Sequence, residues 1–264
     1  MFIHYDKLRN DNFHKGETSS MIYGIHAVTE AIRAGKEIDK LFLQEGLKSD
    51  LSSELRRLTK ENNIIYVMVP GAKLERIAAG KNHQGCVAFL SSVSYSKIEN
   101  ILPAVFEAGR TPLLLILDRI TDVRNFGAIA RSAECAGVDA IIIPTRGSAQ
   151  INADAVKTSA GALHSIPVCR EDNIKATLEY LKESGLRIAS CTEKGSTPHA
   201  STDLSGPLAI IMGSEEDGIS PEYLKRSDVR ILIPMRGKIS SLNVSVATGI
   251  VLFEVLRQRE IAND

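Results

Sequence analysis

The chain has 264 residues, a length that allows one large domain or two smaller ones. Its 32 basic residues balance 32 acidic ones, so net charge gives no sign of a nucleic-acid partner, which would need a local basic cluster. No apolar run approaches the roughly 18 residues needed to cross a membrane, and residues 1–20 lack the apolar segment of a signal peptide. We expect a cytoplasmic protein with a loose polar tail over residues 1–20.

Four cysteines stand far apart in the sequence, with no C-x-x-C pair, and the six histidines are equally scattered. This spacing favours buried, reduced thiols over disulfides or metal ligands. The cysteines are Cys86, Cys135, Cys169 and Cys191. We therefore expect no metal site.

Residues 21–92 alternate between helical and strand-like patterns. In "GIHAVTEAIRAG", Val28 and Ile32 share one helical face, and Gly35 offers a stop. The stretches "KLFLQ", "IIYVMV" and "GCVAFLS" are strand-like, with the helical "LSSELRRLTKEN" and "AKLERIAAG" between them. The pattern predicts a small α/β domain. Residues 93–112 have weaker periodicity, and we expect a linker there that contains a short helix.

Residues 113–264 form a longer and more regular unit. Six apolar runs read as strands: "LLLILD", "AIIIP", "IPVC", "RIASCT", "LAIIMG" and "VRILIP". Amphipathic helices are expected between most of them and after the last one, over residues 126–136, 154–163, 174–184, 221–227 and 244–258. This alternation predicts an α/β fold with a parallel sheet covered on both faces. Such a sheet binds its ligand beyond the carboxyl ends of its strands.

The common cofactor signatures are missing. The sequence has no G-x-G-x-x-G, which argues against a dinucleotide oxidoreductase and against the usual Rossmann-type methyltransferase. Its Gly-Lys pairs are never followed by Ser or Thr, so a phosphate-loop NTPase is excluded. There is also no H-E-x-x-H and no G-x-S-x-G.

Polar residues gather after the strand "LLLILD", in "RITDVRNFGAIAR". Asn125 can cap the following helix, and Gly127 lets another group approach the backbone closely. Arg131 should point back towards the strand end, because helical side chains lean towards the N-terminus. A helix cap with a surface arginine is the alternative. A local basic cluster suited to phosphate is nevertheless predicted from Arg119, Arg124, Arg131 and Arg146.

Two further strand ends carry similar loops. After "LAIIMG" comes "SEEDGIS", where Gly213 should admit a ligand ring against the backbone and Glu215 should supply an acceptor; a plain acidic turn is the alternative. After "VRILIP" comes "MRGKISSLNVS", where Ser241 and Asn243 exceed what one helix cap needs. The small residues that follow Asn243 indicate a core or subunit contact. We expect all three loops to lie on neighbouring strands and to form one pocket.

Together these segments resemble the SpoU (also called TrmH) family of RNA ribose 2′-O-methyltransferases. The family's first motif, Asn-x-Gly-x-x-x-Arg, matches Asn125, Gly127 and Arg131; the second matches "MGSEEDGIS" and the third "SSLNVSVATG". The likeness covers residues 113–259. Residues 21–92 resemble the family's RNA-binding domain, which has a ribosomal-protein-like fold. The subgroup that methylates a guanosine ribose of 23S rRNA is the most similar.

The resemblance implies a deep trefoil knot of the SPOUT class in residues 113–264 and a homodimer through the last helix. It implies S-adenosylmethionine as the cofactor, held by Gly213, Ile233, Leu242, Met235 and Thr192. It also implies catalytic roles for Arg131, Asn125, Ser241, Asn243 and Glu215.

Arg131 should bind the phosphate beside the target ribose and stabilise the nascent alkoxide, because a guanidinium does not readily lose a proton. Of Ser241 and Asn243, one should face the nucleotide and the other should brace Arg131 or the motif loops.

The sequence departs from the family pattern at Glu216, where Gly is frequent, and at Val123 and Arg124. A side chain at Glu216 would narrow the RNA approach or change the loop dihedrals. Two other functions stay open: a tRNA ribose 2′-O-methyltransferase, and a catalytically idle RNA-binding ribosome-assembly factor. The second would be favoured if the motif residues were replaced, and they are present.

Overall fold

The computed structural model describes residues 21–263 and divides into two compact units, with the boundary between Ser92 and Val93. The polar tail expected over residues 1–20 lies outside the described residues. Across the described part of the chain, every helix is too short or too polar to traverse a lipid bilayer.

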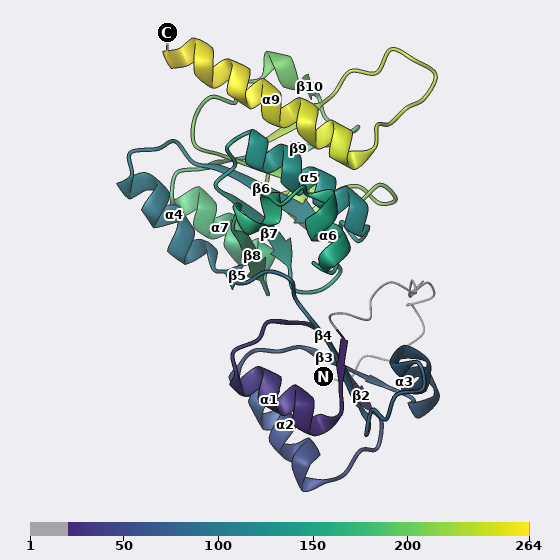
Figure 1. Cartoon of the computed structure of the whole chain (residues 1–264). Helices are drawn as coiled ribbons and strands as arrows, with labels where there is room; N and C mark the ends of the chain where they lie inside the picture. Colours follow the sequence, from purple (N-terminus) through teal and green to yellow (C-terminus); the bar gives the residue numbers. More distant parts are fainter. Residues whose placement is uncertain (1–20, 264) are drawn as a thin grey trace. The chain divides into compact units, whose positions relative to one another are not determined.

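The first unit is a four-stranded sheet with helices on both faces (Figure 1). The central strand β4 runs antiparallel to β1 and β2, and β3 runs parallel to β2. Alternate residues of β2 face opposite sides: Leu41 and Leu43 pack with α1 and α2, whereas Phe42 packs with α3. The elements are β1 (Met21–Tyr23), α1 (Ile25–Arg33), β2 (Ile38–Gln44), α2 (Asp50–Glu61), β3 (Tyr66–Val69), α3 (Gly71–Ala78) and β4 (Cys86–Leu90).

The second unit contains an eight-stranded sheet in the order β10-β12-β9-β11-β6-β7-β8-β5 within the described residues. All its strand pairs are parallel, as the apolar runs predicted. Its strands are β5 (Tyr95–Ser96), β6 (Leu113–Asp118), β7 (Ala140–Pro144), β8 (Val168–Glu171), β9 (Arg187–Cys191), β10 (Thr197–Pro198), β11 (Leu208–Gly213) and β12 (Val229–Leu232).

Helices cover both faces of this sheet (Figure 1). One face of the core holds α5, α6 and α9, and the other holds α4 and α7. Leu114 and Leu115 of β6 are both fully buried, on opposite faces, which explains why the strands are apolar without alternation. The helices are α4 (Ile98–Glu107), α5 (Val123–Cys135), α6 (Ala153–Thr158), α7 (Ile174–Glu183), α8 (Pro221–Leu224) and α9 (Val244–Asn263), with 3-10 turns η1 (Ala162–His164) and η2 (His199–Ser201).

Residues 93–112 differ from the expected linker. The segment does contain a short helix, but it belongs to the second unit: β5 pairs with β8, and α4 packs against the sheet. Ile98, Leu102 and Val105 recur at helical spacing and are buried, so α4 has an apolar stripe that the sheet covers.

Several helix boundaries also differ from expectation. The helix α8 ends at Leu224 rather than 227, and α9 continues to Asn263 rather than ending at 258. The helix α5 begins at Val123 rather than 126, because the Asp122 side chain caps it by accepting from the Asn125 backbone N–H at 2.7 Å. The helix expected over 154–163 stops at Thr158. Ala160 and Gly161 have left-handed backbones, with φ of 51° and 89°, and the chain then makes a separate 3-10 turn.

The cysteines are only partly as expected. Cys86 and Cys169 are buried, and burial raises the pKa of both thiols to about 12. Cys191 is half-buried, and Cys135, the last residue of α5, is exposed, so the expectation of four buried thiols is wrong. No group of three His, Cys, Asp or Glu side chains suited to a metal occurs within the described residues.

Candidate active site

The site lies at the aligned carboxyl ends of β6 and β11. These neighbouring parallel strands place Asp118 opposite Gly213. Asp118 is buried, and its Oδ2 accepts a hydrogen bond from the Ser220 backbone N–H at 2.6 Å. The last residue of β6 therefore holds the loop that follows β11.

Gly213 opens that loop, and its role differs from the one expected. A Cβ at this position would lie 2.2 Å from the Gly218 carbonyl carbon and 2.4 Å from the Ile219 nitrogen. Glycine is thus required because the loop's own backbone crosses over the strand end. The space that we expected a ligand ring to fill at Gly213 is occupied by residues 218 and 219.

Arg119 holds the same loop from the β6 side. Its guanidinium donates to Asp217 Oδ2 at 3.0 Å and to the Gly218 carbonyl at 3.1 Å, and it also contacts Asp118. Arg119 has a left-handed backbone, with φ of 60°, which is costly for a residue with a side chain. Of the four arginines expected to attract phosphate, this one is therefore engaged by the loop, whereas Arg124, Arg131 and Arg146 are exposed.

The first turn of α5 carries the next group. Asn125 was expected to cap this helix, but Asp122 does so, and the Asn125 side chain is free to face the loop after β11. Gly127 does permit a close approach: a Cβ there would lie 2.7 Å from Thr158 Cβ and 2.8 Å from the Ala155 carbonyl oxygen. The group that approaches is α6, so Gly127 serves helix packing.

The side chains of Asn125, Glu215 and Asn243, one from each motif segment, form one hydrogen-bonded cluster. Glu215 Oε1 accepts from Asn243 Nδ2 at 2.8 Å and from Asn125 Nδ2 at 3.3 Å. Asn243 Nδ2 also donates to Asn125 Oδ1 at 2.9 Å. Both amide hydrogens of Asn243 are thus used, and the carboxylate receives two charge-assisted bonds. The structure brings these three predicted site residues together.

The same cluster forms the beginning of α9. Asn243 Oδ1 accepts from the Ser245 backbone N–H at 2.9 Å, the bond of an N-cap. Glu215 Oε1 also accepts from the Val244 backbone N–H at 3.3 Å, which places a negative charge at the positive end of the helix. A single cap would not need Glu215, so the extra polar residues join the loops.

The remaining predicted catalytic residues, Arg131 and Ser241, are exposed. Neither side chain makes a hydrogen bond or ion pair with any part of residues 21–263, so both are available to a ligand. Asn243 links the motif loops through Asn125 and Glu215, and none of its hydrogen bonds involves Arg131. Glu216 is exposed as well, and its backbone is not left-handed; Gly218, with φ of 66°, makes the turn. The backbone at Glu216 therefore does not require glycine, and the effect of this side chain on the RNA approach stays a prediction.

The predicted cofactor residues lie at the ends of adjacent strands. β9 lies between β11 and β12, so the three motif loops are not on neighbouring strands as expected; residues 233–243 carry the chain from β12 back to the β6–β11 edge. Thr192 follows β9, where its backbone N–H donates to the Ile231 carbonyl, and Ile233 follows β12. Met235 and Leu242 each leave 38% of their surface exposed.

Sequence reasoning missed the roles of Asp118 and Arg119. An aspartate that ends the apolar strand "LLLILD" was the available signal, because a buried carboxylate needs a partner. The partners, Ser220 and Asp217, are about a hundred residues away, and only the register of β6 and β11 brings them together.

A parallel sheet with helices on both faces and polar loops at its carboxyl edge defines an α/β protein with a candidate ligand site at that edge. Comparison with known families then gives two matches. Residues 112–253 match the SpoU rRNA Methylase family, and residues 21–96 match the family described as RNA 2′-O ribose methyltransferase substrate binding. The chain belongs to the SpoU methylase family of RNA 2′-O-methyltransferases.

Individual proteins agree with this assignment. A TrmH family tRNA/rRNA methyltransferase of Staphylococcus saprophyticus is 36% identical over 92% of this chain and 98% of its own length. The crystal structure of an AdoMet-bound rRNA methyltransferase from Sinorhizobium meliloti is 26% identical, with a TM-score of 0.57 over 90% of this chain and 86% of that one. The A. aeolicus TrmH/SpoU tRNA modifying enzyme is 31% identical, with a TM-score of 0.54 over 63% of this chain and 86% of that one.

Proposed function

We propose that the chain transfers the methyl group of S-adenosylmethionine to the ribose 2′-hydroxyl of a guanosine in 23S rRNA. The observation that carries this proposal is the hydrogen-bonded cluster of Asn125, Glu215 and Asn243, which joins all three motif loops. It leaves Arg131 and Ser241 exposed and uncommitted beside the joined loops.

The residues at the strand ends fit the proposed cofactor. S-adenosylmethionine supplies the methyl group, and its purine needs an apolar surface and backbone hydrogen-bonding groups. Met235 and Leu242 offer exposed apolar side chains on the segment after β12. Thr192 and Ile233 follow two adjacent strands and Gly213 ends a third, so the backbones of all three lie at the carboxyl edge of the sheet.

The catalytic roles follow from charge and exposure. Arg131 keeps its guanidinium free, so it can hold an RNA phosphate in a bidentate manner and stabilise negative charge on the attacking oxygen. Ser241 offers a hydroxyl to the nucleotide. Asn243 and Glu215 position the loops that carry these groups.

Ribosomal RNA is favoured over tRNA by the extent of the matches. The S. meliloti rRNA methyltransferase aligns with 90% of the chain, whereas the A. aeolicus tRNA modifying enzyme aligns with 63%. In the proposed arrangement the first unit, residues 21–92, holds the RNA and residues 113–264 carry the methyl transfer. The proposal includes a location in the cytoplasm, where the enzyme would meet its rRNA substrate.

We also propose a homodimer through α9, formed by a different face of the helix from the one that its small residues suggested. The small residues after Asn243 pack inside the chain: Thr248 is fully buried, and Gly249 faces Ser132 of α5. An apolar stripe on another side of α9 is exposed instead, at helical spacing. It consists of Val246, Ile250, Phe253 and Ile261. The trefoil knot is proposed for residues 233–263, which leave β12 and pack α9 against α5.

The activity can be tested with the full-length chain, radiolabelled S-adenosylmethionine and unmodified transcripts of 23S rRNA and of tRNA. Label should enter the 23S rRNA at one guanosine, and reverse transcription at low nucleotide concentration should stop at its 2′-O-methyl group. Label in tRNA alone would favour the tRNA enzyme. Cofactor binding without label in either RNA would favour the assembly factor.

A further inference from the structure

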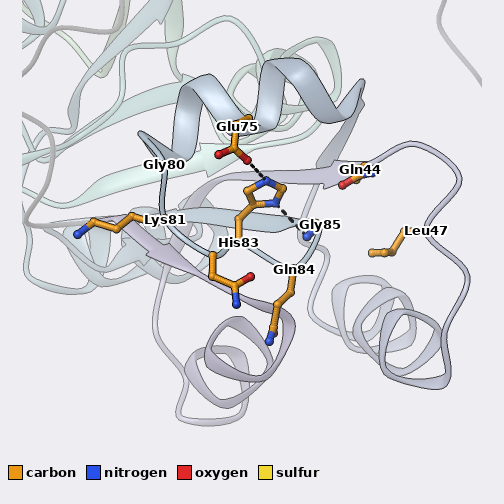
Figure 2. A pocket seen from close by; sticks show the side chains of 9 residues that line it. Gln44, Leu47, Glu75, Gly80, Lys81, His83, Gln84 and Gly85 are labelled. Carbon is orange, nitrogen blue, oxygen red and sulfur yellow. Dashed lines mark hydrogen bonds and ion pairs between the residues drawn. The ribbon is translucent and has the colours of Figure 1, made fainter.

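The first unit contains an open cavity of about 490 Å³, and Figure 2 shows the side chains that line it. It lies between the end of β2, the helix α3 and the loop over residues 79–85. Its volume is within the range of roughly 300–1,000 Å³ that is usual for small-molecule sites. The lining combines polar and apolar surface and includes the three amide side chains of Gln44, Asn82 and Gln84.

Hydrogen bonds fix the wall of this cavity. His83 Nδ1 accepts from the Gly85 backbone N–H at 3.0 Å, so Nε2 carries a proton and donates to Glu75 Oε2 at 2.9 Å (Figure 2). The Gln44 backbone N–H donates to the Gly85 carbonyl at 2.9 Å, and Cys86 donates to the His83 carbonyl at 2.8 Å. The imidazole ring therefore has one orientation, and the loop is tied to β2.

Gln84 lines the cavity, and its side-chain oxygen lies next to the backbone of Gly24. The Gln84 backbone is left-handed, with φ of 49°, a conformation that glycine would adopt more easily. Its side chain is exposed and makes no hydrogen bond with the described part of the chain. No hydrogen bond within the described residues uses this amide, so its donors and its acceptor are open to a ligand.

The chemistry of the lining selects the ligand. An amide both donates and accepts, as the edges of nucleic-acid bases do, and three amides around one cavity can read a base edge. Leu47 and the fixed His83 ring offer apolar contact to a base, and Lys81 offers a charge to phosphate. A base inside an RNA duplex cannot enter such a cavity, whereas an unpaired base can.

We propose that this cavity binds a single unpaired nucleotide of the RNA substrate, with Gln84 hydrogen-bonded to the base. The inference rests on the proposed function, because it takes RNA as the substrate. It adds a second point of RNA recognition in the first unit, one that reads a base.

The test uses the full chain and a set of labelled RNA hairpins in fluorescence-anisotropy titrations. Four hairpins carry one bulged nucleotide, A, C, G or U, and a fifth is fully paired. The parent chain should bind at least one bulged hairpin about tenfold more tightly than the paired one, the effect of one or two base-edge hydrogen bonds. Equal affinity for all five hairpins would overturn the proposal.

Gln84→Gly removes the amide while easing the backbone, so its loss of binding cannot come from strain. It should abolish the preference for the bulged hairpin. Asn63→Gly is the matched control, because Asn63 is also exposed and left-handed, with φ of 53°, but does not line the cavity. This control should keep the preference. A preference that survives Gln84→Gly would contradict the proposal.

These outcomes are independent of methyl transfer. A bulge preference that disappears in Gln84→Gly, in a chain that methylates no RNA, would support the cavity and refute the proposed function. Methylation of 23S rRNA by a chain without any bulge preference would support the proposed function and refute the cavity proposal.

Discussion

Asn243 Nδ2 lies 2.8 Å from Glu215 Oε1, and this contact joins the beginning of α9 to the loop after β11. The same nitrogen reaches Asn125 Oδ1, which lies 118 residues earlier in the sequence. Asn243 also caps α9 through its own oxygen. The Asn243 side chain thus caps α9 with its oxygen and links the loops of the site with its NH2 group.

These two roles can be separated with Asn243→Asp. Aspartate still caps α9, because its oxygen can accept from Ser245, but it cannot donate to Glu215 and places a second negative charge beside it. Methyl transfer should fall at least about tenfold, while the thermal midpoint should change by only a few degrees. Single-turnover methylation and thermal unfolding of the same sample provide the measurement. An unchanged rate would show that the link between the loops is dispensable.

Arg131→Lys should keep the fold and lose most of the methyl-transfer rate. Arg131 is exposed and without protein partners in residues 21–263, so its replacement has no structural cost. Lysine retains the charge but not the planar fork, and loss of one such transition-state contact costs about 10²–10³ in rate. Arg124→Lys, on the same helix and also exposed, is the control. It should stay close to the parental rate, because lysine keeps the charge that attracts phosphate and Arg124 has no proposed role at the reacting oxygen. If both variants behave alike, Arg131 has no catalytic role.

Arg119→Gly tests whether the loop after β11 must be held from the β6 side. Glycine relieves the left-handed backbone at this position but removes the bonds to Asp217 and to the Gly218 carbonyl. We expect kcat to fall several-fold with a small change in stability, because Glu215 loses its fixed position. Arg119→Lys should recover part of the rate through Asp217. A parental kcat in Arg119→Gly would mean that Asp118 alone is sufficient to hold the loop.

The parallel sheet and its helices could be predicted, because continuous apolar strands and helical periodicity are local properties of the sequence. The cap of α5 could not, since Asp122 and Asn125 are both good caps and spacing does not choose between them. The position of β9 between β11 and β12 is set by pairing between distant segments, so the neighbouring-strand expectation failed. The site residues were recognisable as a group, but their contacts depend on that topology.

Gly213→Ala should lower the stability of the protein, and not only its affinity for the cofactor. The added methyl group would meet the backbone of Gly218 and Ile219, which cannot rotate away as a flexible side chain can. We expect a loss of about 1–3 kcal/mol in the free energy of unfolding, together with weaker cofactor binding. Urea unfolding and calorimetry measure the two effects. Gly206→Ala is the control, because a Cβ there meets nothing within 4 Å, and it should change neither quantity.

The last prediction concerns pH and the carboxylate of Glu254 in α9. Arg257 donates to it through Nε at 2.8 Å and Nη2 at 2.6 Å, and Gln258 Nε2 donates at 2.8 Å. These bonds lower the pKa of Glu254 from 4.5 to about 2, and the hydrogen bonds from Arg257 contribute most. Gln258 in turn accepts from the Leu204 backbone N–H, so the carboxylate helps to hold α9 against that loop.

A pKa that is lower in the folded state than in the unfolded state stabilises the fold above the unfolded value, and this contribution disappears as pH falls through the folded value. Glu254→Gln should therefore be less stable than the parent chain by about 1 kcal/mol at pH 7, as expected for a surface ion pair. The difference should shrink between pH 4.5 and pH 2. Glu260→Gln, on the same helix and without a hydrogen bond within residues 21–263, is the control and should stay close to the parent at every pH. Urea unfolding at pH 7, 5, 4 and 3 measures the difference, and a gap that stays constant down to pH 3 would show that Glu254 acts through its shape and not its charge.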